Sequence, residues 1–105
     1  MALRFLLGRG FDVVARNVRI GNGELDLVGY DAGTLVFVEV KTRSRRDAYA
    51  PQTAVDRRKQ DKLVRLAEAF CHRYGLEDVP IRFDIVAVTL EKSDQSEVKH
   101  FVRAF

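Results

Sequence analysis

The length and composition of this chain fit one soluble globular domain. Its 105 residues are 47% hydrophobic and 31% charged, with a net charge of +3, which is ordinary for a folded unit with one core. No stretch approaches the roughly 20 apolar residues that span a bilayer. The N-terminal apolar segment is short and contains Arg4, so we expect no signal peptide. Cys71 is the only cysteine, so we exclude an internal disulfide and expect a cytoplasmic protein.

The first part of the chain predicts a short helix followed by three strands. Residues 2–8 carry apolar side chains at helical spacing and end at a glycine, which favours a helix. A strand is expected over Asp12 to Ile20. Two apolar runs then flank the turn residues Asp31-Ala32-Gly33, a pattern that predicts a β-hairpin over residues 23–43.

A long helix is expected in the middle of the chain. Thr53 is a favourable N-cap, and Asp56 three residues later makes a variant of the capping box. An apolar stripe at helical spacing continues to about Tyr74, and Gly75 is expected to end the helix. Cys71 falls on this stripe, so we interpret it as a core residue rather than a nucleophile.

Two further strands are expected after the helix, over Ile81 to Leu90 and over Glu97 to Phe105. The element order is therefore α-β-β-β-α-β-β. This order predicts one α/β domain over residues 1–105, with a mixed β-sheet flanked by helices. Because the long helix crosses from the third strand to the fourth, these two strands should be parallel, with a right-handed connection.

Two titratable residues interrupt these last strands. Asp84 lies within an apolar run, and we expect it to pair structurally with Arg82 or with a cation of the helix, rather than to face a site. His100 shares a strand face with valine and has no evident partner for a catalytic triad.

Four charged residues of the hairpin form the candidate site. Residues 35–40 are almost continuously apolar, which is typical of a strand covered on both faces, so Glu39 and Lys41 at its end break the pattern, as functional residues often do. Side-chain alternation puts Glu24 and Asp26 on one face of the preceding strand, and the hairpin brings them alongside. A solvated Glu and Lys at the end of a hairpin is the alternative interpretation.

The chemistry of this group favours magnesium. Carboxylates hold Mg²⁺ through one or two protein groups, with water and substrate phosphate completing the shell, whereas the group lacks the His and Cys ligands of zinc. Asp26, Glu39 and Glu24 are the candidate metal ligands for phosphodiester hydrolysis. Lys41 would orient or deprotonate the attacking water, or neutralise charge on the phosphate.

A basic segment follows the hairpin. Residues 41–65 contain nine of the 18 basic residues and only three acidic ones, which indicates a polyanionic partner such as DNA. The alternative is a solvated helix face. The candidate nucleic-acid-binding residues are Arg43, Arg45, Arg46, Arg57, Arg58, Lys59, Gln60 and Lys62, with Arg19 from the first strand.

An acid in one strand followed by Glu-x-Lys in the next resembles the PD-(D/E)xK restriction-endonuclease-like superfamily. Asp26 matches its first acid, and Glu39 and Lys41 match its second acid and lysine. Over nearly the whole chain, ordered blocks are similar to the YraN-like bacterial proteins, which are incompletely characterised and similar to Holliday-junction resolvases. These blocks are Gly-Arg-Gly-Phe, Ala-Arg-Asn-Val-Arg, Gly-Glu-Leu-Asp-Leu-Val, Phe-Val-Glu-Val-Lys-Thr-Arg, Ala-Val-Asp-Arg-Arg-Lys-Gln and Arg-Phe-Asp-Ile-Val-Ala-Val.

The resemblance implies an endonuclease that uses Mg²⁺, or Mn²⁺ in its place, on structured or branched DNA. It also implies a homodimer, since a four-way junction needs two symmetric cuts. The family pattern has a helical Glu ahead of the position of Ala2, so we expect either a truncated N-terminal helix or Glu24 in that role. Two alternatives stay open: a nucleic-acid-binding module that keeps the fold without catalysis, and a protein-interaction domain.

Overall fold

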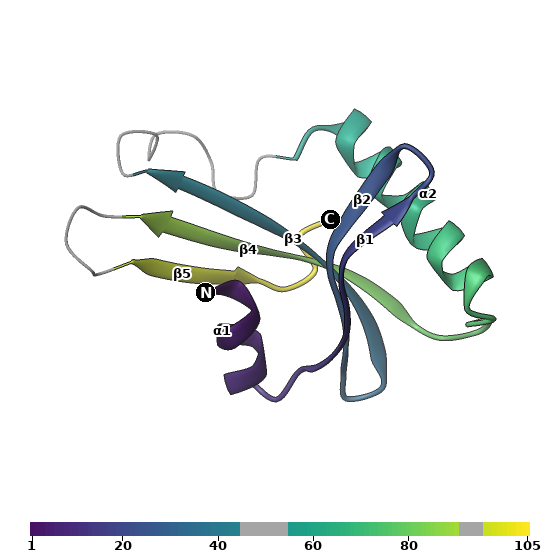
Figure 1. Ribbon diagram of the computed structural model, residues 1–105, viewed down its shortest axis with the longest axis horizontal. Helices are drawn as coiled ribbons and strands as arrows, with labels where there is room; N and C mark the ends of the chain where they lie inside the picture. Colours follow the sequence, from purple (N-terminus) through teal and green to yellow (C-terminus); the bar gives the residue numbers. More distant parts are fainter. Residues whose placement is uncertain (45–54, 91–95) are drawn as a thin grey trace.

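The computed structural model of the protein describes residues 1–44, 55–90 and 96–105. Within these residues the predicted order α-β-β-β-α-β-β is confirmed (Figure 1). The elements are α1 (Ala2–Gly8), β1 (Asp12–Ile20), β2 (Gly23–Asp31), β3 (Thr34–Ser44), α2 (Arg57–Arg73), β4 (Ile81–Leu90) and β5 (Glu97–Phe101). None of the helices in these ranges has both the length and the apolarity that crossing a membrane requires.

The described strands form one mixed sheet in the order β1-β2-β3-β4-β5. β3 and β4 are parallel, as the crossover through α2 predicted, and the other neighbouring pairs are antiparallel. The turn between β2 and β3 is the predicted one. Ala32 and Gly33 have φ angles of 49° and 86°, the positive values that a two-residue hairpin turn requires.

The sheet is covered on both faces, and β3 contributes to both cores. Leu35 and Phe37 point to the α2 side and pack with helix residues such as Phe70. Val36 and Val38 point to the opposite side and pack with Leu6 of α1 and its neighbours. This alternation explains the continuous apolar run in β3, and the expectation of a strand buried on both faces is confirmed.

The β1–β2 hairpin leaves the rest of the sheet and leans towards α2 (Figure 1). β2 pairs with β3 only from Asp31 back to Leu27, whereas its pairing with β1 continues to Gly23. The free end of the hairpin touches the helix at Gly23, where a Cβ would lie 2.7 Å from both terminal methyls of Leu66. The separation of β2 from β3 opens a space between the hairpin, β3 and α2.

The N-cap of α2 differs from the prediction. The helix begins at Arg57, and Asp56 caps it by accepting a hydrogen bond of 2.8 Å from the backbone N–H of Lys59. Thr53, the expected cap, lies outside the described residues. At the other end the helix stops at Arg73, and Gly75 follows with a φ of 63°, which agrees with the predicted glycine stop.

The last strand is shorter than predicted, because it ends at Phe101 instead of Phe105. Arg103 has a φ of 53°, and its backbone N–H donates to the Asp84 carboxylate at 3.0 Å. The N–H of Ala104 donates to the carbonyl of Phe83 at 2.8 Å. These bonds turn the tail back over β4, so the tail cannot extend the strand.

Asp84 is the centre of a buried polar network. Its side chain is fully buried and accepts hydrogen bonds from Arg82 at 2.9 and 3.0 Å, so the expected structural pairing with Arg82 is confirmed. His100, for which the sequence showed no evident catalytic triad, joins this network, since its Nε2 lies 2.7 Å from Asp84. In the antiparallel β4–β5 pair His100 lies opposite Val86, so Asp84, two residues before Val86, is its diagonal neighbour on the same face of the sheet.

Candidate active site

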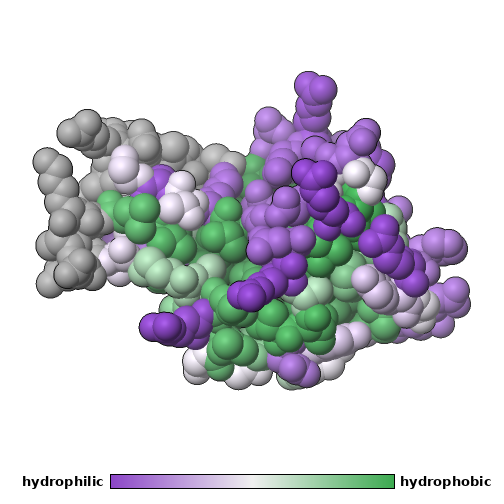
Figure 2. Space-filling model, viewed as in Figure 1, coloured by the Kyte–Doolittle hydropathy of each residue, from purple (hydrophilic) through white to green (hydrophobic). Residues whose placement is uncertain are grey.

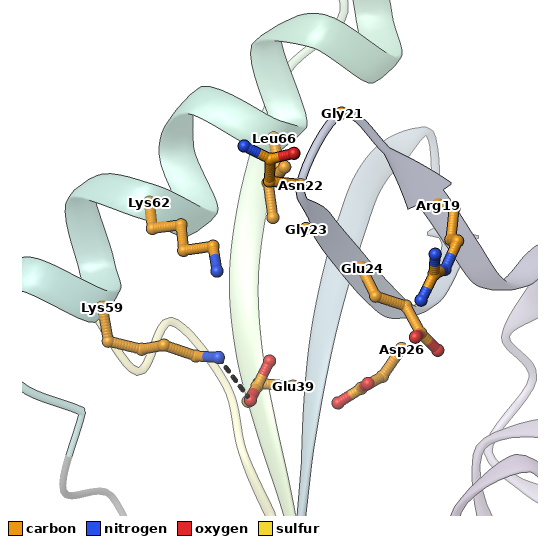
Figure 3. Close-up of a pocket in the computed structure, with 10 residues that line it drawn as sticks. All are labelled: Arg19, Gly21, Asn22, Gly23, Glu24, Asp26, Glu39, Lys59, Lys62 and Leu66. Atoms are coloured by element: carbon orange, nitrogen blue, oxygen red, sulfur yellow. Dashed lines mark ion pairs between the residues drawn. The ribbon is translucent and has the colours of Figure 1, made fainter.

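A cavity of about 540 Å³ lies between the β1–β2 hairpin, β3 and α2. Its floor is formed by strand residues, and α2 forms one wall (Figure 3). The side chains that line it are mostly polar or charged. They are Arg19, Gly21, Asn22, Gly23, Glu24, Asp26, Glu39, Lys59, Lys62 and Leu66. Three of the four residues of the predicted site, Glu24, Asp26 and Glu39, therefore border one cavity.

Asp26 lies where β2 separates from β3. Its Oδ2 accepts a hydrogen bond of 2.8 Å from the backbone N–H of Val40, beyond the last β2–β3 register pair. The carboxylate thus satisfies a strand N–H that β2 no longer reaches, in a half-buried position. This bond holds Asp26 beside the β3 residue that carries the second acid.

Glu39 projects from β3 between Asp26 and α2 (Figure 3). Its side chain is 15% exposed, and its Oε1 lies 3.5 Å from Nζ of Lys59. Burial raises the pKa of Glu39 above 4.5 and the negative charge of Asp26 adds to that rise, while Lys59 and Lys41 oppose it. The effect of Asp26 shows that the two carboxylates are close enough to repel each other.

Lys41 is the fourth predicted residue, and its placement differs from that of the acids. Its positive charge lowers the pKa of Glu39, so it lies within electrostatic reach, as two-residue alternation along β3 requires. Among the described residues that line the cavity, however, the cations are Arg19, Lys59 and Lys62. Lys59 is the lysine of this lining that makes an ion pair with Glu39.

Glu24 is exposed and lies opposite Arg19 in the β1–β2 register. In the described part of the chain, no three side chains of the His, Cys, Asp and Glu types are grouped to hold a metal ion. Glu24 thus borders the cavity without completing a ligand cluster with Asp26 and Glu39. The donor set that fits a divalent cation is the pair Asp26 and Glu39, which is the number of carboxylates that Mg²⁺ sites commonly use.

The predicted nucleic-acid-binding residues fall into several groups. Lys59 and Lys62 line the cavity with Arg19, whereas Arg57 and Arg58 are exposed outside it. Arg57 makes an exposed ion pair with Asp61 at 3.2 Å.

The other predicted nucleic-acid-binding residues either do not line the cavity or lie outside the described residues. Gln60 donates from Nε2 to the carbonyl of Val55 at 2.9 Å, so its amide braces the start of α2. Arg43 is half-buried in β3. Arg45 and Arg46 lie outside the described residues.

Sequence reasoning placed Lys59 among the DNA contacts and among the candidate neighbours of the site, but it did not predict the ion pair with Glu39. A signal was present in the first turn of α2, which contains Arg57, Arg58 and Lys59 and no acidic residue. Cations at a helix N-terminus oppose the helix dipole, and such a break in local preference often marks a functional role. Asn22, in the hairpin turn above the cavity, carried no comparable signal.

Comparison with known proteins identifies the family. The model of the uncharacterised protein family UPF0102 matches residues 1–88. This chain belongs to the UPF0102 family. The expected membership of the YraN-like proteins is thereby confirmed.

Relatives in this family resemble the chain over most of its length. The UPF0102 protein STH1475 of Symbiobacterium thermophilum is 49% identical over 87 residues, covering 83% of this chain and 74% of the relative. A UPF0102 protein of Solibacter usitatus is 46% identical over 99 residues, covering 92% and 75%. The UPF0102 protein GSU0650 of Geobacter sulfurreducens is 39% identical over 105 residues, covering 100% and 82%.

Proposed function

We propose that this UPF0102 protein is a metal-dependent endonuclease that hydrolyses phosphodiester bonds in structured or branched DNA. The observation that carries the proposal is the pair of carboxylates from neighbouring strands, Asp26 and Glu39, in a cavity with cations on its rim. Residues 1–105 would act as one endonuclease-like domain in the cytoplasm. The choice of branched DNA, and of a homodimer to cut it symmetrically, follows from the resemblance to Holliday-junction resolvases.

Asp26 and Glu39 would hold Mg²⁺, or Mn²⁺ in its place. Their mutual repulsion and the raised pKa of Glu39 indicate a position where a divalent cation relieves an unfavourable charge. When bound, the cation would activate a water molecule for attack on phosphorus and stabilise charge on the phosphate. Glu24 borders the same cavity and is positioned to bind a water molecule of that shell.

Basic residues of β3 and α2 would interact with the phosphates of the DNA backbone. Lys41, close enough to Glu39 to affect its pKa, would orient the attacking water or stabilise charge that develops on the phosphate. The exposed basic residues of α2 extend from the cavity wall, and hydrophilic side chains gather over this helix and the adjacent hairpin (Figure 2). Such a surface holds phosphates by charge and reads little sequence.

The test is a cleavage panel of end-labelled duplex, flap and four-way-junction DNA with Mg²⁺ and with Mn²⁺. We expect the wild-type protein to cut a branched substrate only with metal. Asp26→Asn keeps the size of the side chain, and Lys41→Ala removes the ammonium. Each change should lower the cleavage rate by about 100-fold or more, because Asp26→Asn weakens the binding of the cation and Lys41→Ala removes a positive charge that acts on the reacting phosphate.

Glu68→Gln is the matched control, since Glu68 is an exposed acid of α2 that does not line the cavity, and it should retain full activity. Wild-type protein that cuts no substrate with either metal refutes the endonuclease. If DNA binding then survives in Asp26→Asn and Lys41→Ala and weakens with salt, the protein is a non-catalytic binding module.

A further inference from the structure

The contact between Lys59 and Glu39 links the helix wall of the cavity to its acidic floor. The ammonium lies 3.5 Å from the carboxylate, and the pair is drawn as the dashed line in Figure 3. Glu39 is also one of the two carboxylates assigned above to the cation. Lys59 therefore occupies the electrostatic position at Glu39 that a divalent cation would take.

The backbone of Lys59 is held in place, whereas its exposed side chain can move to a different anion. Its backbone is fixed, because its N–H donates to the capping Asp56 at 2.8 Å. Its side chain is 46% exposed, against 15% for Glu39, and a lysine stem has four flexible carbons. The ammonium can therefore leave Glu39 for another anion at the cavity mouth while the helix stays in place.

The charges that line the cavity favour such an exchange. With every group ionised, the acids Glu24, Asp26 and Glu39 balance the cations Arg19, Lys59 and Lys62. A divalent cation would give this lining a charge of about +2, which matches two phosphodiester groups. Binding of the cation would thus change the net charge of the cavity lining from about zero to positive, and a positive lining would attract a DNA strand.

We propose that Lys59 and a divalent cation compete for Glu39, and that Lys59 transfers to a substrate phosphate when the cation binds. This inference rests on the proposed function. It makes Lys59 a positioning residue that couples metal binding to DNA binding. Because such coupling is reciprocal, DNA should strengthen metal binding by the same factor by which metal strengthens DNA binding.

Metal binding without DNA tests the competition. Mn²⁺ is titrated at fixed pH, and the free ion is followed by its electron paramagnetic resonance signal. Lys59→Gln should bind Mn²⁺ about twofold to fivefold more tightly than wild type, the range expected for loss of a partly exposed ion pair.

Lys62→Gln is the control, because Lys62 lines the same cavity one turn along the helix, whereas the ion pair described for Glu39 is with Lys59. Its Mn²⁺ affinity should change less. Equal or larger tightening in Lys62→Gln overturns the proposal.

DNA binding tests the transfer. Fluorescence anisotropy of a labelled four-way junction is measured with EDTA and with Mn²⁺, in a Lys41→Ala background that suppresses hydrolysis. The quantity compared is the ratio of the junction affinity in Mn²⁺ to that in EDTA. This ratio should be about twofold to fivefold smaller in Lys41→Ala/Lys59→Gln than in Lys41→Ala, because one ion pair is missing from the metal-bound complex. The same factor in both proteins overturns the transfer.

Failure of the proposed role of Lys59 and failure of the proposed endonuclease activity give different results. Metal-dependent cleavage by wild type, together with equal behaviour of the Lys59 and Lys62 variants, removes the role of Lys59 and leaves the endonuclease intact. If Mn²⁺ binds to neither wild type nor Lys59→Gln, with or without the junction, both the competition and the endonuclease are wrong.

Discussion

Among single residues, Glu39 is held where its ionised form is unfavourable. Its side chain is largely buried next to Asp26, and both effects raise its pKa above 4.5 in spite of Lys59 and Lys41. A folded protein keeps such a carboxylate at the expense of stability when the charge serves another purpose. The loss of folding stability caused by ionised Glu39 can be measured separately from any activity.

Glu39→Gln should increase the free energy of unfolding at neutral pH. A group whose folded-state pKa is raised contributes stability that is fully present below its unfolded pKa and is lost as the pH rises through the folded pKa. The wild-type protein therefore loses this contribution as the pH rises from below 4.5 through the raised pKa of Glu39, whereas the Gln variant lacks the titration. Urea unfolding in EDTA across that range should show an advantage of the variant that grows with pH. An advantage that is constant or shrinks with pH would contradict the assignment.

Among elements, the contact that matters most for the cavity is that of the β1–β2 hairpin with α2. A Cβ on Gly23 would lie 2.7 Å from the Cδ1 and Cδ2 atoms of Leu66, closer than side chains pack. With the Leu66 side chain in this position, the hairpin end lies on the helix because residue 23 has no side chain, and a larger residue would require Leu66 to move. The contact fixes one wall of the cavity relative to the other.

Gly23→Ala should destabilise the protein by about 1–3 kcal/mol, the usual range for overpacking. Leu66→Ala makes room for the new methyl group, so the double variant should be more stable than the sum of the two single changes predicts. Gly8→Ala serves as the control, since a Cβ there meets nothing within 4 Å, and it should be close to neutral. Chemical unfolding of the four variants gives the coupling energy, and strict additivity would rule out the contact.

At the scale of the whole molecule, the Asp84 network ties distant segments to the sheet centre. Arg82 bridges Asp84 to Asp31 of the β2 end, with its Nη2 3.0 Å from Asp31. Nε2 of His100 contacts Asp84, and its Nδ1 lies 3.0 Å from Nη1 of Arg9. Since an arginine only donates, Nδ1 accepts and Nε2–H donates to the carboxylate. One buried acid thereby orders β4, β5 and the segment after α1.

Asp84→Ala should destabilise the protein by about 3–5 kcal/mol, because it leaves the guanidinium of Arg82 buried without its main partner. The side chain of Asp31 is 41% exposed, so Asp31→Ala should lose no more than about 1 kcal/mol. Thermal unfolding of both variants is the measurement. Complete failure of Asp84→Ala to fold agrees with the prediction, given a typical total stability of about 5–15 kcal/mol. Similar losses in the two variants would contradict it.

The sequence by itself determined the features that depend on neighbours along the chain. Alternation placed Leu35 and Phe37 on one face of β3 and Val36 and Val38 on the other, since successive side chains of a strand point in opposite directions. The positive φ angles of Ala32 and Gly33 are those that a two-residue hairpin turn needs. The position of Asp26 and Glu39 on neighbouring strands followed from this hairpin.

Only the tertiary structure decided which charged groups meet. β2 separates from β3 beyond Leu27, where the hairpin lies on α2, and there Asp26 accepts a hydrogen bond from the backbone of Val40. The docking of α2 also brought Lys59 to Glu39, and strand pairing brought His100 to Asp84. Such partners are far apart in sequence, so local preference cannot select them. Their choice depends on how the helix and strands pack together.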